Sequence, residues 1–385
     1  MKFPLKLKLA AWLISNQFKK KKNEFVPNAD HNKAINDFAS ATNNPAITTT
    51  HQQKDGKVHF SFAGHKNHKD KSNPDRKTVF RWYSITKTFT AIGIMQLREK
   101  NLLSLNDSIS KYLDFPNGDK IEIKHLLNHT SGLPQEGPEL FSWSHSSKKN
   151  YIGTQSFLKQ QLHSFKKIKH QPGTHYGYSN FGYHLLGAII EKVSGQKYDE
   201  YIVASIIEPL GLKNTFFYRP KEQINFAEGQ VESSSLYKLL TEHFYPSALE
   251  QAIPPTSISY FSPFEFYPNT LAASGLFGTI EDLYIFGKAL LDGFLGQENG
   301  LLKTDSFSQM IAGTTAMTGS SQKWELRSGM GLKIGKSNGK TFIMTDGSAP
   351  GFSSALRIYT KDKDIAAVVT NRSPMPIYQI LDAIG

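Results

Sequence analysis

The stretch "RWYSITKTFTAIGIMQL", residues 81–97, decides the fold that we predict for this chain of 385 residues. Most of it is apolar with the spacing of a buried helix, which we expect to run from Thr86 to about Lys100. Ser84 and Lys87 stand at its head, three residues apart, so their side chains can meet on one face. A serine hydroxyl is a poor nucleophile until a base takes its proton, and a lysine whose charge is disfavoured can serve as that base. Ser-x-x-Lys also occurs often by chance, so the rest of the chain must decide.

Two further clusters place small polar residues at the ends of regular elements. The first follows a Pro-Gly turn and opens an apolar helix, and the second lies at a strand end among small residues. A nucleophile, a proton carrier and backbone N–H donors are the parts of an acyl-transfer site. The residues of the two clusters are Tyr178, Ser179 and Asn180, and Thr345, Asp346, Gly347 and Ser348.

Strands are predicted at both ends of the chain and helices in the middle. "ITTTHQQKDGKVHFSFAG", residues 47–64, indicates a hairpin because Asp-Gly separates two β-prone runs. Four short segments that are typical of strands follow residue 329. We therefore expect an α/β fold whose layered part is built from residues 30–101 and 271–385, with a helical lobe inserted at about 102–270.

The composition excludes several classes of function. The chain has no cysteine, which rules out disulfides and thiol nucleophiles, and its 13 histidines lack the spacing of a metal site. No cofactor is predicted. The formal charge is +12, but residues 1–28 hold seven lysines against one glutamate and the remainder is only mildly basic. Since no nucleic-acid-binding motif is present either, we expect a small-molecule substrate and no nucleic acid.

The N-terminal stretch "MKFPLKLKLAAWLISNQFKKKK", residues 1–22, permits two interpretations. Its apolar run is short for a signal peptide and far too short to span a bilayer. Residues 1–29 are therefore expected to form a solvated basic tail, or an interfacial segment in which residues 1–22 contact an anionic membrane surface. Both interpretations favour a cytoplasmic or membrane-surface location over secretion.

Five stretches, in order, give the chain a resemblance to the serine β-lactamase-related hydrolases, which include class C β-lactamases, DD-peptidases and related esterases and amide hydrolases. Ser-x-x-Lys is the nucleophile motif of that superfamily. The resemblance covers roughly residues 30–385 and implies an antiparallel sheet flanked by helices, with a helical lobe and the site between them. The stretches are "FRWYSITKTFTAIGIMQL", "HLLNHTSGLP", "PGTHYGYSNFGYHLLGAIIEKVSG", "LAASGLFGTIEDLYIFGKALLDG" and "TDGSAPGFSSALRI".

The resemblance implies a role for each residue around the serine. It makes Ser84 the acylated nucleophile, Lys87 its partner and Tyr178 the general base. Asn180 would contact Lys87 and the substrate, and the loop that contains His129 would be structural. Because an ammonium group favours a nearby phenolate, we also expect Lys87 to lower the pKa of Tyr178.

The cluster from Thr345 to Ser348 departs from the family pattern. The family usually has Lys-Thr-Gly or His-x-Gly where this chain has Thr345, Asp346 and Gly347. The backbone N–H groups of Ser84 and Ser348 would be the oxyanion donors, and Gly347 would permit a close backbone approach. Because this motif lacks the family's lysine or histidine and contains the carboxylate of Asp346 instead, neutral or cationic substrates should fit better than carboxylates. Asp346 could face the substrate, or turn away and either cap a turn or pair with a nearby lysine.

Three functions remain open at this point. We favour a serine hydrolase that acts on esters or small amides through an acyl-enzyme. A β-lactamase or DD-peptidase is the second hypothesis. The third is a non-catalytic binding or scaffold protein with the same fold, because the third motif is irregular and the first strand is unusually polar.

Overall fold

The computed structural model covers the residues that carry the fold and the predicted site. The basic stretch 1–22, predicted to be a tail or an interfacial segment, lies outside the described residues. No helix within the described part of the chain is long and apolar enough to span a membrane. The described residues are 25–28, 30–67, 69–134, 144–145, 153–161, 167–220, 225–232, 260–261, 267–269, 271–317, 324–337, 339–349 and 351–385.

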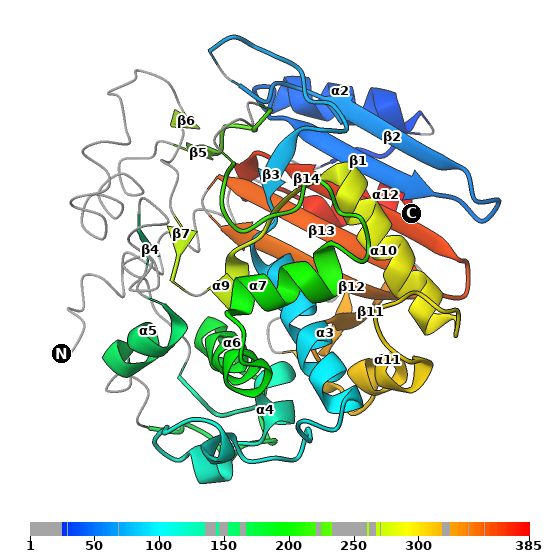
Figure 1. Ribbon diagram of the computed structural model, residues 1–385. Helices are drawn as coiled ribbons and strands as arrows, with labels where there is room; N and C mark the ends of the chain where they lie inside the picture. The colour runs from blue at the N-terminus through cyan, green and yellow to red at the C-terminus, as the bar shows by residue number, and fades with distance from the viewer. Residues whose placement is uncertain are drawn as a thin grey trace.

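An antiparallel sheet of eight strands forms the centre of the molecule, in the order β2-β1-β14-β13-β12-β11-β10-β9 (Figure 1). The predicted hairpin is confirmed, because β1 and β2 pair directly around the Asp-Gly turn. Strands from the two ends of the chain meet where β1 pairs with β14. The strands are β1 Ile47–Gln52, β2 Val58–Ala63, β9 Thr315–Ala316, β10 Glu325–Ser328, β11 Lys333–Ser337, β12 Lys340–Ala349, β13 Phe352–Tyr359 and β14 Asp364–Thr370.

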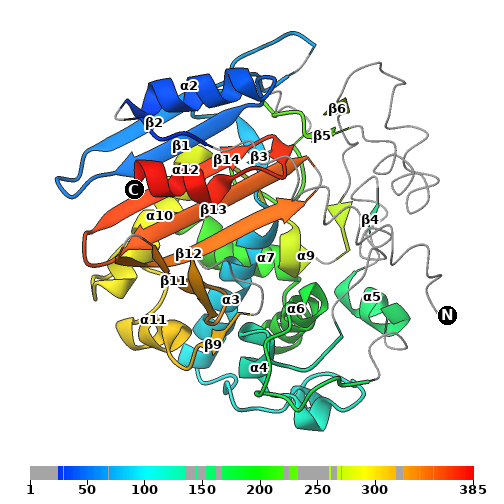
Figure 2. The ribbon, with the colours of Figure 1, turned by 180° about the vertical axis from the view of Figure 1, so that it is seen from behind.

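Helices cover both faces of this sheet. In β14, Ala366 and Val368 pack into one core, and Ala367 and Val369 pack into the other, as the two-residue period of a strand requires. Helices α2 (His31–Ala41) and α12 (Ile377–Ile384) cover the first face (Figure 2). Helix α10 (Ile280–Phe294) covers the second. The sheet is therefore buried on both sides, and the α/β fold predicted from the sequence is confirmed.

Helix α3 (Thr86–Glu99) lies between the sheet layer and the remaining helices. It begins at the predicted residue and almost all of its residues are buried. Helix α6 (Asn180–Ser194) begins where Ser179 accepts a hydrogen bond from the Gly182 N–H and ends at Gly195, whose φ is 73°. The other helices of the described residues are α4 Ile123–Leu127, α5 Thr154–Gln161, α7 Tyr198–Ile202, α9 Leu271–Ser274 and α11 Thr304–Ile311, with a π-helical turn at Val203–Ile207 and 3₁₀ turns at Tyr83–Ile85, Ile109–Lys111 and Gly118–Lys120.

Short strand pairs complete the described structure. Of these, β3 matters for function because it leads directly into the turn that carries Ser84. The pairs are β3 (Val79–Arg81) with β8 (Phe277–Thr279), β4 (Ser144–His145) with β7 (Tyr267–Pro268), and β5 (Gln230–Glu232) with β6 (Tyr260–Phe261) and β15 (Arg372–Ser373).

The polar first strand has a structural explanation. Strand β1 is second from the edge and pairs with a neighbour on each side, so its backbone groups are satisfied. Its threonines are β-branched and suit a strand, and the Thr48 hydroxyl donates to the Val369 carbonyl at 3.3 Å. The polarity of this strand is therefore compatible with its buried position.

Candidate active site

The serine predicted to be the nucleophile lies on a strained turn between β3 and α3. Tyr83, directly before Ser84, has a φ of 46°, in the left-handed region that costs a non-glycine residue about 1–3 kcal/mol. The surrounding packing holds this conformation, because Trp82 is fully buried and the Thr86 hydroxyl donates to the Tyr83 carbonyl at 2.6 Å. The strain places Ser84 at the head of α3, where its side chain reaches the cavity.

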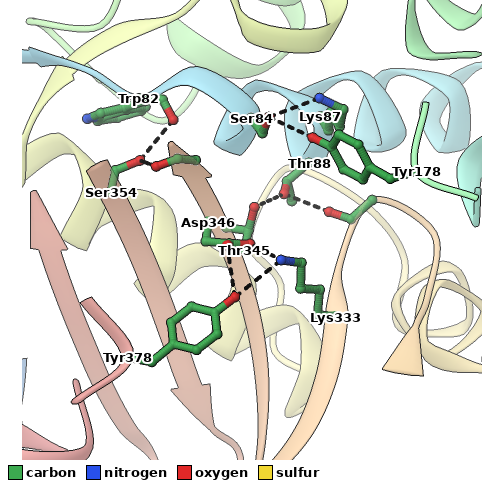
Figure 3. A network of polar contacts seen from close by, with 12 residues as sticks. Trp82, Ser84, Lys87, Thr88, Tyr178, Lys333, Thr345, Asp346, Ser354 and Tyr378 are labelled. Atoms are coloured by element: carbon green, nitrogen blue, oxygen red, sulfur yellow. Dashed lines mark hydrogen bonds and ion pairs between the residues drawn. The ribbon is translucent and has the colours of Figure 1, made fainter. Parts of the chain in front are cut away.

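The structure brings together four residues that the sequence predicted to act together. The Ser84 Oγ lies 2.7 Å from the Tyr178 hydroxyl and accepts a hydrogen bond from the Lys87 Nζ at 3.0 Å (Figure 3). Lys87, only 4% exposed, also donates to the Asn180 Oδ1 and to the Ala273 carbonyl, both at 2.8 Å. The lysine is thus fixed in place, with one of its N–H groups directed at the serine.

The environment of Tyr178 differs from the prediction. Burial raises the pKa of Tyr178 well above its usual value, and the hydrogen bond between Tyr178 and Ser84 and the charge of Lys333 offset this only in part. The expectation that Lys87 would lower this pKa is therefore wrong for the free protein. Removing a phenolate from water costs more free energy than the nearby positive charges return.

His129 packs beneath the tyrosine and does not contact Ser84. Its ring centroid lies 4.6 Å from that of Tyr178, and its Nδ1 accepts a hydrogen bond from the Ser179 N–H at 3.2 Å. Burial, together with the charges of Lys87 and Lys333, holds the pKa of His129 well below its usual range, so the ring is neutral. The neutral His129 ring packs against the Tyr178 ring and helps to hold it in place. This packing role agrees with the structural role that the resemblance implied for the loop.

Strand β12 approaches the serine turn so closely that only glycine fits at position 347. A Cβ atom on Gly347 would lie 2.1 Å from the Trp82 carbonyl oxygen and 2.6 Å from the Ser84 nitrogen. The Ser354 hydroxyl, on β13, lies 2.9 Å from the Trp82 carbonyl oxygen and 3.3 Å from that of Gly347. Because N–H and C=O point in opposite directions across a trans peptide, the Ser348 N–H points away from β13. Ser354 thus links the two backbone segments that carry the predicted oxyanion donors.

Thr345 and Asp346 point to opposite sides of β12. The Thr345 hydroxyl is buried and accepts a hydrogen bond from Thr88 of α3 at 2.9 Å, so it ties the strand to the helix. Asp346 forms an ion pair with Lys333 and accepts a hydrogen bond from the Tyr378 hydroxyl at 2.8 Å. Of the two directions left open by the sequence, the structure shows pairing with a lysine, and the pair still lines the cavity.

Lys333 is the residue that sequence reasoning missed. The expectation that this part of the site lacks a cation is wrong, because β11 supplies one beside Asp346. The register places Lys333 opposite Met344, and Asp346 is then the diagonal neighbour two residues further along β12. Opposite charges on successive strands were the only signal in the sequence, and the register needed to use that signal is a property of the folded sheet.

A cavity of about 230 Å³ joins these groups. Asn180 accepts a hydrogen bond from Lys87 but does not line the cavity. Within the described residues, no group of three or more histidine, aspartate or glutamate side chains is placed to hold a metal ion. The wall is formed by Ser84, Lys87, His129, Tyr176, Tyr178, Tyr183, Met317, Ser328, Gly329, Gly331, Leu332, Lys333, Met344, Thr345, Asp346 and Ser348.

Comparison with known proteins gives matches over most of the chain. The profile of the Beta-lactamase family matches residues 50–383. Penicillin-binding protein 4* of Bacillus subtilis is 35% identical over 45% of this chain and 39% of its own length. A putative penicillin-binding protein of the same organism, PbpX, is 29% identical over 73% of this chain and 64% of its own length. The matches thus span less than two thirds of these relatives.

Solved structures share the fold. The octameric penicillin-binding protein homologue from Pyrococcus abyssi aligns with a TM-score of 0.74 at 25% identity, over 89% of this chain and 73% of its own. The D-amino acid amidase from Ochrobactrum anthropi SV3 in complex with L-phenylalanine amide aligns with a TM-score of 0.75 at 20% identity, over 92% and 98%. A class C beta-lactamase aligns at 0.69 and 18% identity, over 92% and 95%. The last two matches show a common fold alone.

Proposed function

Because this chain belongs to the beta-lactamase family of serine hydrolases, we propose that it cleaves esters or small amides through an acyl-enzyme on Ser84. The observation that carries the proposal is the hydrogen-bonded group of Ser84, Lys87 and Tyr178 at the wall of a cavity. A nucleophile in direct contact with two proton carriers is the arrangement that covalent catalysis by serine requires.

Acylation begins when the Ser84 Oγ attacks the carbonyl carbon of the substrate. The hydroxyl proton passes to the pair formed by Lys87 and Tyr178, and the carbonyl oxygen becomes an oxyanion. The backbone N–H groups of Ser84 and Ser348 then donate to this oxyanion, which is the largest single contribution in many acyl transfers. The pair returns the proton to the leaving group as the bond to it breaks, and the acyl group remains on Ser84.

Deacylation repeats these steps with water as the nucleophile. The pair takes a proton from the water, which attacks the acyl carbon, and the proton returns to the Ser84 Oγ as the ester bond breaks. Lys87 and Tyr178 exchange protons within one hydrogen-bonded unit, so their titration belongs to the pair and not to either residue alone. The active form is the one in which this unit has lost one proton. Burial raises the pKa of the Tyr178 hydroxyl and so disfavours loss of that proton from the tyrosine.

Support for esters and amides over β-lactams comes from the charge beside the serine. Lys333 supplies a cation, but Asp346 neutralises it, so a substrate carboxylate meets no net attraction there. The D-amino acid amidase named above carries out amide chemistry on this fold. The curated relatives are penicillin-binding proteins, which keeps β-lactam hydrolysis and DD-peptidase activity as the second hypothesis.

Two chromogenic substrates test the proposal. We expect the wild-type protein to hydrolyse p-nitrophenyl butyrate with a higher kcat/KM than nitrocefin. Ser84→Ala should lower both rates by several powers of ten, on the order of those measured for other serine nucleophiles, without changing thermal unfolding. Preference for nitrocefin would favour the β-lactamase hypothesis. Hydrolysis of neither substrate would favour the non-catalytic one.

A further inference from the structure

One wall of the cavity has no part in the proton transfers described above. This ion-pair wall consists of Lys333 on β11, Asp346 on β12 and Tyr378 on α12 (Figure 3). The Lys333 Nζ pairs with the Asp346 Oδ1 and donates to the Tyr378 hydroxyl at 3.3 Å. The side chains of Lys333 and Asp346 are 21% and 18% exposed, so a molecule bound in the cavity can reach both.

The wall carries two opposite charges and no net charge. Burial alone would lower the pKa of Lys333, but Asp346 and the Tyr378 phenol more than reverse this effect and raise it well above its usual value. The ammonium group therefore stays charged over the whole working range of pH. The Tyr378 hydroxyl, which donates to the Asp346 Oδ2 at 2.8 Å, holds the carboxylate in position.

The ion pair still has hydrogen-bonding capacity to offer. An ammonium group has three N–H donors, and in the described part of the structure Lys333 uses two of them, toward Asp346 and Tyr378. Each carboxylate oxygen of Asp346 accepts one hydrogen bond there and retains a second lone pair. A bound group thus meets one donor and two acceptors side by side.

An uncharged amide matches this arrangement. Its carbonyl oxygen can accept from Lys333 while its N–H donates to Asp346. A carboxylate would satisfy Lys333 but repel Asp346, and an ammonium group would do the reverse. An alkyl group would satisfy neither, and it would displace water from both charges at a cost in free energy.

We propose that Lys333 and Asp346 form a binding subsite for an uncharged amide group on the acyl part of the substrate. The proposal rests on the proposed function and narrows it. The substrates are esters or amides whose acyl part carries a second, uncharged amide, as in N-acylated or peptide-like acyl groups.

Four p-nitrophenyl esters of phenylacetic acid test this subsite. They carry a carboxamide, a carboxylate, an aminomethyl or an ethyl group in the para position, so they differ in charge and hydrogen bonding but little in size. Each kcat/KM is divided by the rate of uncatalysed hydrolysis of the same ester. For the wild type we expect the carboxamide to exceed each of the other three esters by about tenfold, the usual size of one partly solvated polar contact.

Single substitutions should change the preference in opposite directions. Asp346→Asn leaves Lys333 unpaired and should raise the ratio of carboxylate to aminomethyl ester about tenfold. Lys333→Met leaves Asp346 unpaired and should lower that ratio by a similar factor. Any effect of either variant on the proton carriers acts on all four esters alike and cancels in the ratio.

The double variant Lys333→Met/Asp346→Asn decides the matter if a single variant fails to fold, because it leaves no unpaired charge. It should lose the preference for the carboxamide over the ethyl ester. Retention of that preference, or a carboxylate-to-aminomethyl ratio that is the same in both single variants, would overturn the subsite. Ser84-dependent hydrolysis without any preference removes the subsite and keeps the proposed function. If the wild type shows no Ser84-dependent hydrolysis of any ester, both proposals fall.

Discussion

The two sides of the cavity are built in different ways. On the serine side, Ser84, Lys87 and Tyr178 come from the beginnings of two helices, α3 and α6, and from the turns before them. On the ion-pair wall, Lys333 and Asp346 come from neighbouring strands and are joined by the C-terminal helix α12. Lys87 is almost fully buried, whereas the two charged groups of the wall remain about one-fifth exposed. This difference fits our proposals that the serine side carries out the chemistry and that the ion-pair wall selects the substrate.

Substitutions of Lys87 and Tyr178 should have the largest effects on activity, because they remove the groups that we propose to transfer protons. We expect Lys87→Met and Tyr178→Phe each to lower kcat by about 10²- to 10⁴-fold, the usual contribution of general acid–base catalysis. The loss in the double variant should be close to that of the worse single variant, because the two residues act as one unit. Steady-state kinetics with p-nitrophenyl butyrate measure all three. A double loss equal to the product of the single losses would show that the residues act independently.

Ser354 tests whether the strands support the serine side. Ser354→Ala removes the hydroxyl that reaches the carbonyls of Trp82 and Gly347, and it leaves buried acceptors without that donor. We expect a stability loss of about 1–3 kcal/mol and a fall in kcat of about tenfold, because the Ser348 N–H is no longer held in place. Thr48→Val is the matched control, since it removes a buried hydroxyl from β1, two strands away from β13 in the same sheet, that donates to neither the Trp82 nor the Gly347 carbonyl. Equal kcat values in the two variants would show that Ser354 has only a structural role.

The pH dependence should give the smallest effect and connects the two sides. Burial raises the pKa of Tyr178, and the charge of Asp346 adds to that increase. Because the raised pKa disfavours a Tyr178 phenolate, we expect the deprotonated form of the Lys87–Tyr178 unit to grow as pH rises, so kcat/KM should climb between pH 6 and pH 9. Asp346→Asn removes one of the causes of the raised pKa. Its rising limb should move to lower pH by less than about one unit.

Stopped assays with the neutral ethyl ester measure both profiles. A wild-type kcat/KM profile that is already level at pH 6 would show that the proton carrier is already deprotonated in the free protein, and it would contradict the raised pKa of Tyr178 as the cause of the pH dependence. An upward shift in Asp346→Asn would contradict the electrostatic coupling between the two sides.

Part of the serine side could be predicted because its information is local. Ser84 and Lys87 are one helical turn apart, so spacing along the chain is enough to bring these two together. Tyr178 and Asn180 flank the cap of a second apolar helix, and the resemblance to the hydrolase family, not their spacing, assigned them to the same site. The α/β fold followed from hydrophobic periodicity in the same way. The depression of the Tyr178 pKa was predicted wrongly, because the depth of burial depends on packing from several elements.

The ion-pair wall could not be predicted from the sequence, because its contacts also depend on how distant segments pack. Lys333 meets Asp346 only through the register of β11 on β12, and a shift by one residue would turn the lysine to the other face of the sheet. Tyr378 joins them from a helix at the end of the chain. Contacts of this kind depend on the assembled sheet, and a single sequence does not specify them.

Covalent labelling of Ser84 tests the central claim most directly. The wild-type protein is treated with a fluorophosphonate that reacts with activated serines, and the adduct is located by mass spectrometry of its peptides. We predict one adduct, on Ser84, that is absent in Ser84→Ala and forms much more slowly in Lys87→Met, while both variants remain folded at the assay temperature. An unlabelled wild-type protein, or an adduct on another serine, would contradict the claim that Ser84 is the activated nucleophile of this site.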